Sequence, residues 1–165
     1  MAESTRELTG TLVRLEPLRE RHHAALQAIH QRPEVLEFWG EPDHDFPDDE
    51  PTSARWAVVF EDRVVGLIQY WEETEAASRH AGIDIFLDPD VHGRGIGTDA
   101  ISALVDHLFT DLDHRRIVID PEVRNVAAIR CYEKVGFQPI GVERQSFFIG
   151  GAWRDCLLMD LLRTD

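Results

Sequence analysis

The sequence predicts a single domain of the α+β, or mixed α/β, class. Three observations support this class: strand-like segments lie before, between and after two helix-like segments, apolar residues follow the period of each element, and no linker or internal repeat divides the chain. With 165 residues, of which 43% are hydrophobic, the chain can bury one sizeable core. We therefore expect one domain over residues 1–165 and one site, located where two strand ends part.

The N-terminal part predicts a strand, a broken helix, a loop and a hairpin. Apolar and polar residues alternate over Thr11–Leu18, which is typical of a strand. Apolar residues at helical spacing follow in residues 19–40, but Pro33 divides them into two short helices. Proline and aspartate dominate Glu41–Ser53, which predicts a loop. β-branched residues on both sides of the turn pair Glu61–Asp62 then predict a hairpin.

The strongest local pattern is a strand, a loop and a helix. In Ala81–Leu87 successive side chains alternate between the two faces, so Asp84 and Phe86 lie opposite the aliphatic residues Ile83, Ile85 and Leu87. A loop rich in proline and glycine leads into a helix over residues 98–109. Its apolar side chains recur at i, i+3, i+4, i+7 and i+8, and they are Ile101, Leu104, Val105, Leu108 and Phe109.

The C-terminal part predicts a strand, a second helix and a hairpin. Arg115–Asp120 is a short apolar run that is typical of a buried strand. Asn125 is a suitable N-cap and Gly136 a suitable stop for the helix that follows. The inner face of this helix carries Ala128, Cys131, Tyr132 and Val135. The remaining residues form two strands joined across Gly150 and Gly151.

The chain has a formal charge of −14, from 31 acidic and 17 basic residues. This balance argues against a nucleic-acid partner, because phosphate binding needs clustered lysine and arginine. A cationic small molecule or a basic peptide fits better. The acidic residues gather in Glu41–Pro51 and Trp71–Glu75, although the first cluster alone is also typical of a solvated loop that aids solubility.

Cysteine usage and hydropathy exclude further classes. Cys131 and Cys156 show no CxxC motif, so we predict neither a disulfide framework nor a metal site, and we expect both in the core. No apolar run reaches the ~18–20 residues of a membrane helix. The start, Met1–Gly10, lacks the basic and apolar regions of a signal peptide. We expect a cytoplasmic protein without a membrane partner, either a monomer or a homodimer.

The loop HGRGIG, residues 92–97, has three glycines directly before a helix. Glycine lets the backbone approach a ligand closely, and N–H groups at a helix N-terminus form a site suited to phosphate. Arg94 would add a charged donor. A dinucleotide-binding GxGxxG motif would need glycine in place of Thr98, and a Walker loop would need GKS or GKT, so both are disfavoured. A purely structural glycine turn remains an alternative for the loop taken alone.

A second segment, DPEVRNVAAIRCYEKVGF at residues 120–137, places three polar side chains along one short element. Asp120 ends a strand and can present its carboxylate at the rim of a cleft. Asn125 begins the helix, and Tyr132 lies two turns further along the same face. Each residue alone also fits a structural role, as a turn, a cap and a core residue.

Together the two segments resemble the GNAT superfamily of acyl-CoA-dependent N-acetyltransferases. HGRGIG resembles that family's pyrophosphate loop, Q/R-x-x-G-x-G/A, although His92 replaces the usual glutamine or arginine. NVAAIRCYEKVGF resembles the family's N-x-x-A-x-x-x-Y-x-K-x-G-F stretch. The resemblance covers residues 30–162 and is most specific over Ala81–Phe137.

More narrowly, AGIDIFL, the DP turn and the tail WRDCLLMDLL are similar to aminoglycoside 6′-N-acetyltransferases. That group has aspartates at the positions of Asp84 and Asp120, and FWGE at residues 38–41 resembles its Trp-Gly element near the substrate. Ile85 stands where many of that group have glutamine.

The resemblance implies a GNAT-like domain, in which a mostly antiparallel sheet flanked by helices splays at a cleft for acetyl-CoA. The cofactor-binding residues that it implies are Phe86, Leu87, His92, Gly93, Arg94, Gly95, Ile96, Gly97, Thr98, Asn125 and Lys134. The residues around a cationic acceptor are Trp39, Glu41, Trp71, Glu72, Glu73, Asp84 and Asp120. The candidate catalytic residues are Asp84, Asp120 and Tyr132.

Amine acetylation requires groups of this kind. The attacking amine must be neutral, whereas alkylamines have a pKa near ~10, so the site must accept a proton. Asp84 or Asp120 is the candidate base, directly or through water, although a carboxylate of pKa ~4 serves better to hold the cationic amine. We place Asp84 at the reacting amine and Asp120 at a neighbouring one. Tyr132 would protonate or hydrogen-bond the departing thiolate, whose thiol has a pKa of ~8.5.

Three functions remain compatible with the sequence. The first is transfer of acetyl from acetyl-CoA to an aminoglycoside amine, at the 6′ position, which would confer antibiotic resistance. The second keeps this chemistry for a protein N-terminus, a lysine, a polyamine or a small metabolite. The third is a non-catalytic acyl-CoA-binding module, which would need neither Asp84 nor Asp120.

Overall fold

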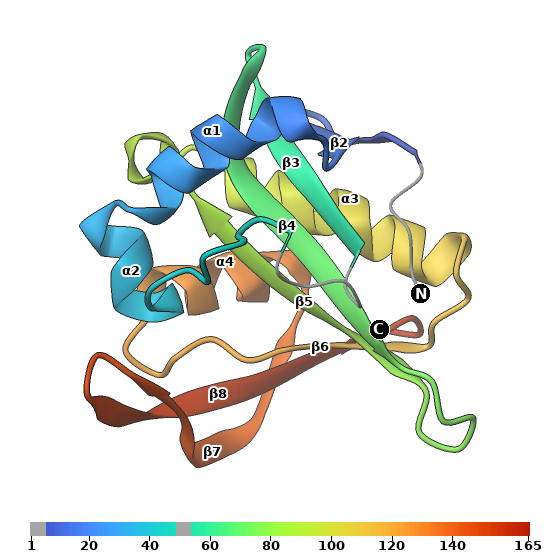
Figure 1. Ribbon diagram of the computed structural model, residues 1–165. Coiled ribbons are helices and arrows are strands. Elements are labelled where there is room, and N and C mark those ends of the chain that lie inside the picture. Colours follow the sequence, from blue (N-terminus) through green and yellow to red (C-terminus); the bar gives the residue numbers. More distant parts are fainter. Residues whose placement is uncertain (1–5, 49–53) are drawn as a thin grey trace.

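The computed structural model describes residues 6–48 and 54–165, which form one 8-stranded mixed sheet and four α-helices (Figure 1). The sheet order is β1-β2-β3-β4-β5-β6-β8-β7. Neighbouring strands are antiparallel except β5 and β6, which are parallel. The predicted class is therefore confirmed. The elements are β1 (Leu8–Thr9), β2 (Arg14–Pro17), α1 (Glu20–His30), α2 (Pro33–Trp39), β3 (Ala54–Phe60), β4 (Arg63–Glu73), β5 (His80–Leu87), α3 (Ile96–Thr110), β6 (Arg116–Ile119), α4 (Val126–Val135), β7 (Gln138–Ile149) and β8 (Ala152–Leu162).

The N-terminal predictions hold with two adjustments. The predicted strand over residues 11–18 is the shorter β2, and β1 pairs with it as an additional strand that the alternation did not indicate. Pro33 is the first residue of α2, which confirms the break between the two helices. The predicted loop over Glu41–Ser53 can be followed to Asp48, because residues 49–53 lie outside the described part of the chain, as do residues 1–5.

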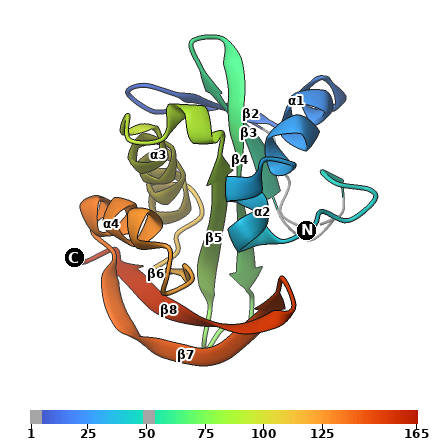
Figure 2. The ribbon, with the colours of Figure 1, turned by 90° about the vertical axis from the view of Figure 1, so that its left-hand side faces the viewer.

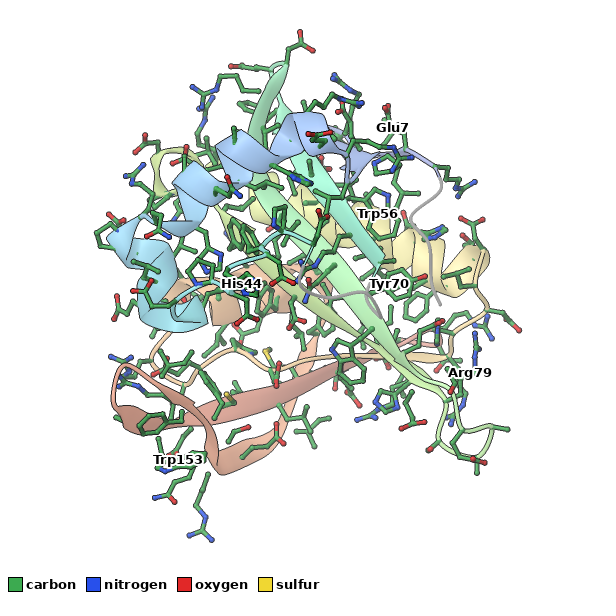
Figure 3. The ribbon with its side chains drawn as sticks, in the orientation of Figure 1. Glu7, His44, Trp56, Tyr70, Arg79 and Trp153 are labelled. Carbon is green, nitrogen blue, oxygen red and sulfur yellow. The ribbon has the colours of Figure 1, made fainter. Side chains whose placement is uncertain are left out.

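Helices cover both faces of the sheet. In Figure 2, α1 and α2 lie on one side of β4 and β5, and α3 and α4 lie on the other. The larger core lies on the α3 side, where Trp56 of β3 and Tyr70 of β4 stack with ring centroids 5.8 Å apart (Figure 3). A smaller core on the α1 side is formed by Leu26, Ile29, Val35, Phe46, Leu67 and Phe86.

The predicted faces of β5 and α3 are confirmed. Phe86 belongs to the smaller core, whereas Ile83, Ile85 and Leu87 pack in the larger one. The helical residues Ile101, Leu104, Val105 and Leu108 are buried, as their spacing predicted. Asn125 caps α4, because its Oδ1 accepts a hydrogen bond from the Ala128 N–H at 3.2 Å. Gly136 ends that helix with a φ of 120°.

The sheet splays between β5 and β6. Only two residue pairs join these strands, Ala81 with Ile117 and Gly82 with Val118. Beyond Gly82 the strands part, and β8 and β7 curve away from the rest of the sheet (Figure 2). The side chain of Trp153 projects from the hairpin of β7 and β8 (Figure 3). The divergence gives the wedge-shaped opening that the family resemblance implied.

Two carboxylates fasten the N-terminal segment. Glu16 accepts hydrogen bonds from His22 at 2.9 Å and from two arginines, Arg14 and Arg21, each at 3.2 Å. Asp99, in the first turn of α3, accepts hydrogen bonds at 2.7–2.9 Å from the backbone N–H groups of residues 11, 12 and 13. The start of the sheet is therefore joined directly to the start of α3.

Candidate active site

A cavity of about 570 Å³ opens between the end of β5, the start of α3, α4 and α2. It occupies the wedge where β5 and β6 part, as expected for ligands of open sheets. Ten of the residues predicted to bind the cofactor line it, namely Phe86, Leu87, His92, Gly93, Gly95, Ile96, Gly97, Thr98, Asn125 and Lys134. Tyr132 and Trp39, predicted for other roles, line it as well.

The glycine loop forms a backbone cradle at the start of α3. Gly93 and Gly95 have φ values of 76° and 80°, which residues with a side chain rarely adopt. A Cβ at Gly93 would meet no atom within 4 Å, and a Cβ at Gly95 would lie 3.9 Å from Leu12. Space is therefore left open above the loop, next to the N–H groups of a 15-residue helix. This arrangement fits the pyrophosphate of an acyl-CoA.

The basic residues around this cradle differ from the predicted set. Arg94 lies outside the cavity lining, with its guanidinium 4.9 Å from the ring centroid of Phe60. Arg130, which the sequence reasoning missed, lines the cavity together with Lys134. These two residues are four positions apart on α4 and so share one helix face. That spacing was the signal by which Arg130 could have been found.

Tyr132 is buried in the α4 face that packs on the sheet, with 7% of its surface exposed. Desolvation raises the pKa of its phenol well above the usual value, and the negative charges of Asp84 and Asp120 act in the same direction. The phenol is therefore protonated at neutral pH. A protonated phenol beside the cavity can donate a hydrogen bond or a proton, but it cannot serve as a base.

Asp84 lies just beyond the point where β5 leaves β6. Its neighbour on β4 is Gln69, whose Nε2 donates a hydrogen bond to Asp84 Oδ2 at 3.0 Å. Both side chains lie on the α1 face of the sheet, opposite Ile83 and Ile85. The position is set by register, because a one-residue slip would turn Asp84 towards α3.

Asp120 follows the last residue of β6 and begins the DP turn. The turn is fixed to β8, where the Leu157 N–H donates to the Pro121 carbonyl at 2.8 Å. Asp120 is exposed, yet the pKa of its carboxyl is raised to about 6, because desolvation by neighbouring protein atoms and the negative charges of Asp84 and Glu143 together disfavour the ionised form. The carboxylates of Asp120, just after β6, and of Asp84, on β5, therefore lie close enough for their charges to interact.

Trp39 is held by an aromatic cluster. Its ring lies edge-on to Phe86, with centroids 5.0 Å apart, and edge-on to His30 at 5.9 Å. His30 Nε2 donates to the Gly40 carbonyl at 3.1 Å, which fixes the end of α2. Phe46 completes the cluster at 4.7 Å from His30. Glu41, two residues after the end of α2, is exposed.

The remaining predicted acceptor residues separate into two groups. Trp71 lies on the same face as Asp84 and crosses Gly82, where an added Cβ would lie 2.2 Å from the indole. Glu73 shares this face by alternation. Glu72 lies on the other face, because its Oε1 accepts a hydrogen bond at 2.7 Å from Nε2 of the buried His114. The structure therefore does not bring Glu72 together with the two aspartates.

The described residues contain no helix that is both long and apolar enough to cross a membrane. Among the same residues, no group of three or more histidine, cysteine, aspartate or glutamate side chains is placed to hold a metal ion. Cys156 is buried, as predicted, whereas Cys131 is partly buried and lines the cavity.

Comparisons with known proteins agree with this geometry. A solved structure of aminoglycoside acetyltransferase AAC(6′)-Ib in complex with coenzyme A superposes with a TM-score of 0.77 at 26% identity, covering 92% of this chain and 95% of that one. The aminoglycoside N(6′)-acetyltransferase type 1 of Klebsiella pneumoniae is 43% identical over 72 residues, which are 43% of this chain and 36% of that protein. Solved neighbours of this fold contain coenzyme A or acetyl-CoA.

Two further relatives are acetyltransferases of other descriptions. The probable N-acetyltransferase YjcK of Bacillus subtilis (strain 168) is 33% identical over 105 residues, or 64% of this chain. The matched segment spans just over half of that relative, 58% of its length. The spermidine N(1)-acetyltransferase of Escherichia coli (strain K12) is 26% identical over 157 residues, which are 89% of this chain and 84% of that protein. The model of the acetyltransferase (GNAT) domain matches residues 13–138, and the chain therefore belongs to the GNAT acetyltransferase family.

Proposed function

We propose that the protein transfers an acetyl group from acetyl-CoA to a primary amine of an aminoglycoside, at the 6′ position, and thereby confers resistance. The observation that carries this proposal is the pair of interacting carboxylates, Asp84 and Asp120, beside the buried phenol of Tyr132. A pair of this kind suits a substrate with several cationic amines. The similarity to aminoglycoside acetyltransferases supports the same choice.

The cavity would hold the cofactor, which supplies an activated acetyl thioester. The open space above Gly93 and Gly95 would receive its pyrophosphate on the backbone N–H groups of α3. Arg130 and Lys134 lie along α4 and would neutralise phosphate charge. Beyond Gly82, β5 no longer pairs with β6, so the backbone groups around Phe86 and Leu87 are available to the pantetheine arm.

Proton transfer would divide between the two aspartates. Asp84, held by Gln69, would orient the reacting amine. Asp120 has a pKa of about 6, closer to neutrality than an ordinary carboxyl group, so it is the better proton acceptor at pH 7. The sequence left the base open between Asp84 and Asp120, and this assignment selects Asp120. Tyr132, which remains protonated, would donate to the departing sulfur.

The experiment is a CoA-release assay with kanamycin, tobramycin, spermine and short peptides as acceptors. We expect turnover with the aminoglycosides, and loss of most of it in Asp84→Asn and in Asp120→Asn. Glu72→Gln is the matched control, since Glu72 faces His114, and it should retain activity. Host cells that express the protein should also need a higher kanamycin concentration for growth arrest. Turnover confined to peptides would refute the aminoglycoside assignment.

A second candidate is a polyamine acetyltransferase. The spermidine N(1)-acetyltransferase of Escherichia coli aligns over 89% of this chain, twice the share covered by the aminoglycoside relative. A linear polycation would meet the same carboxylates. In the same assay, a kcat/KM for spermine that exceeds the value for kanamycin would select this candidate.

A further inference from the structure

Three polar side chains form a row across β3, β4 and β5 that ends at Asp84. Arg55 of β3 is paired with Gln69 of β4, which is paired with Asp84 of β5. Arg55 Nε donates to Gln69 Oε1 at 2.6 Å, and Gln69 Nε2 donates to Asp84 Oδ2 at 3.0 Å. Arg55 and Gln69 are both buried, with 5% and 7% of their surfaces exposed. We call this row the β3–β5 relay.

Only one orientation of the Gln69 amide satisfies both hydrogen bonds. A guanidinium can only donate hydrogen bonds, and an ionised carboxylate can only accept them. Gln69 must therefore turn its oxygen to Arg55 and its nitrogen to Asp84. A flipped amide would place two donors against each other at Arg55 and two acceptors against each other at Asp84. Arg55 thus fixes the rotamer of Gln69, and Gln69 fixes one oxygen of Asp84.

Arg55 is itself firmly anchored. Its Nη1 donates to the Pro47 carbonyl at 2.6 Å, and its guanidinium lies 5.9 Å from the ring centroid of Phe46. Phe46 belongs to the aromatic cluster around His30 that also holds Trp39 at the cavity. The relay therefore joins the loop after α2 to the carboxylate at the mouth of the wedge.

We propose that Gln69 is a positioning residue, which keeps the carboxylate of Asp84 ionised and oriented towards the acceptor amine, and that Arg55 acts on Asp84 through Gln69. This inference rests on the proposed function for the identity of the acceptor. It also explains how two nearby carboxylates take different roles. Asp84 has a buried donor behind it, whereas Asp120 faces the negative charges of Asp84 and Glu143. A site with one fixed anion and one proton acceptor results.

The test is to follow the side-chain carboxyl ¹³C resonance of Asp84 through a pH titration in the wild type and in Gln69→Met. Loss of a hydrogen bond to the ionised form should raise the midpoint by about one pH unit. Asp120 and Tyr132 interact with Asp84 from β6 and α4, and both are unchanged in this comparison. Gln138→Met is the control, because Gln138 is an exposed residue at the start of β7, outside the β3–β5 relay.

Kinetics provide a second readout. In Gln69→Met, kcat/KM for the amine should fall by about tenfold, while KM for acetyl-CoA stays within about twofold. Arg55→Met should give a smaller loss, and the loss should largely disappear when the substitution is made in the Gln69→Met background. If Gln69→Met does not fold, Gln69→Glu carries the test, since it keeps the size and replaces the donor by an acceptor, so the Asp84 midpoint should rise further.

The titration needs no acceptor, so it separates this inference from the proposed function. An unchanged Asp84 midpoint in Gln69→Met or Gln69→Glu would overturn the relay, whichever amine is acetylated. A raised Asp84 midpoint in an enzyme that does not acetylate aminoglycosides would support the relay and refute only the proposed acceptor.

Discussion

Glu143→Gln should shift the acid limb of the pH profile, because Glu143 is one of two negative charges that raise the pKa of Asp120. That pKa moves from the usual 3.8 to about 6, so about half of Asp120 is ionised at pH 6 and about one tenth at pH 5. If Asp120 accepts the proton, kcat/KM for the amine should be about tenfold lower at pH 5 than on its plateau near pH 7.5.

The expected shift in Glu143→Gln is modest. Desolvation is the largest cause of the raised pKa and Asp84 is the second, so removing Glu143 should lower the midpoint by about half a unit or less. The direction of the shift is fixed, because removing the negative charge of Glu143 favours the ionised form of Asp120. Activity at pH 5 should therefore rise relative to the plateau, in a variant whose exposed residue has no role in the chemistry.

The assay is initial-rate CoA release between pH 5 and pH 8.5, quenched and read at one fixed pH so that the thiol reagent behaves uniformly. Glu20→Gln on α1 is the control, since Glu20 is exposed and is not among the charges that act on Asp120. An acid limb with its midpoint near 4, or one that Glu143→Gln moves to higher pH, would refute Asp120 as the proton acceptor. The amine of the substrate titrates far above this range and cannot imitate the limb.

Three further predictions concern the phenol, the glycine loop and the N-terminal anchor. Tyr132→Phe should lower kcat by about tenfold or more with KM for acetyl-CoA unchanged, while the equally buried Tyr70→Phe should not; an unaltered kcat in Tyr132→Phe would remove the phenol from the reaction. Gly95→Val should weaken acetyl-CoA binding in calorimetry, because φ is 80° there and the new side chain fills the cradle; Gly141→Val, which meets open space, should not, and equal binding in both variants would argue against the loop as the phosphate site. Glu16→Gln should lower the free energy of unfolding at pH 7 by up to about 3 kcal/mol, because His22, Arg21 and Arg14 lower the Glu16 pKa from 4.5 to about 2. Because the pKa of Glu16 is lower in the folded than in the unfolded protein, its ionised carboxylate stabilises the fold above pH 4.5, and this stabilisation is lost as pH falls to about 2. In denaturant unfolding, the difference in stability between the wild type and Glu16→Gln should therefore shrink between pH 4.5 and about 2. An equal loss of stability at pH 7 and pH 2 would contradict the pairing.

Periodicity and capping chemistry predicted most of the fold. The helical spacing of α3, the cap at Asn125 and the stop at Gly136 are local signals, and each appears in the structure where the sequence placed it. The strand β1 was not predicted, because its two residues are too few to show the alternation of a strand. The parallel pairing of β5 with β6 is non-local, and no pattern within either strand shows that it lasts for only two residue pairs.

The candidate site could be predicted only where its residues follow one another along a single element. The glycine loop and α4 satisfied this condition. The predicted acceptor residues Trp71, Glu72 and Glu73 also follow one another on β4, but Trp71 and Glu72 face opposite sides of the sheet. The alternation rule that oriented Asp84 would have separated them. Gln69 meets both Arg55 and Asp84 through the register of three strands, and this register depends on the non-local pairing of β4 with β3 and β5.

The carboxylate of Asp99 gives the experimenter a reporter. Three consecutive amide protons, at residues 11, 12 and 13, end on an aspartate four residues beyond Gly95. Their chemical shifts and exchange rates will therefore record any rearrangement of the first turn of α3, although the chain between them is more than eighty residues long. If acetyl-CoA binds at the glycine loop, these three amide resonances should shift on its addition, without a label in the cleft and without turnover.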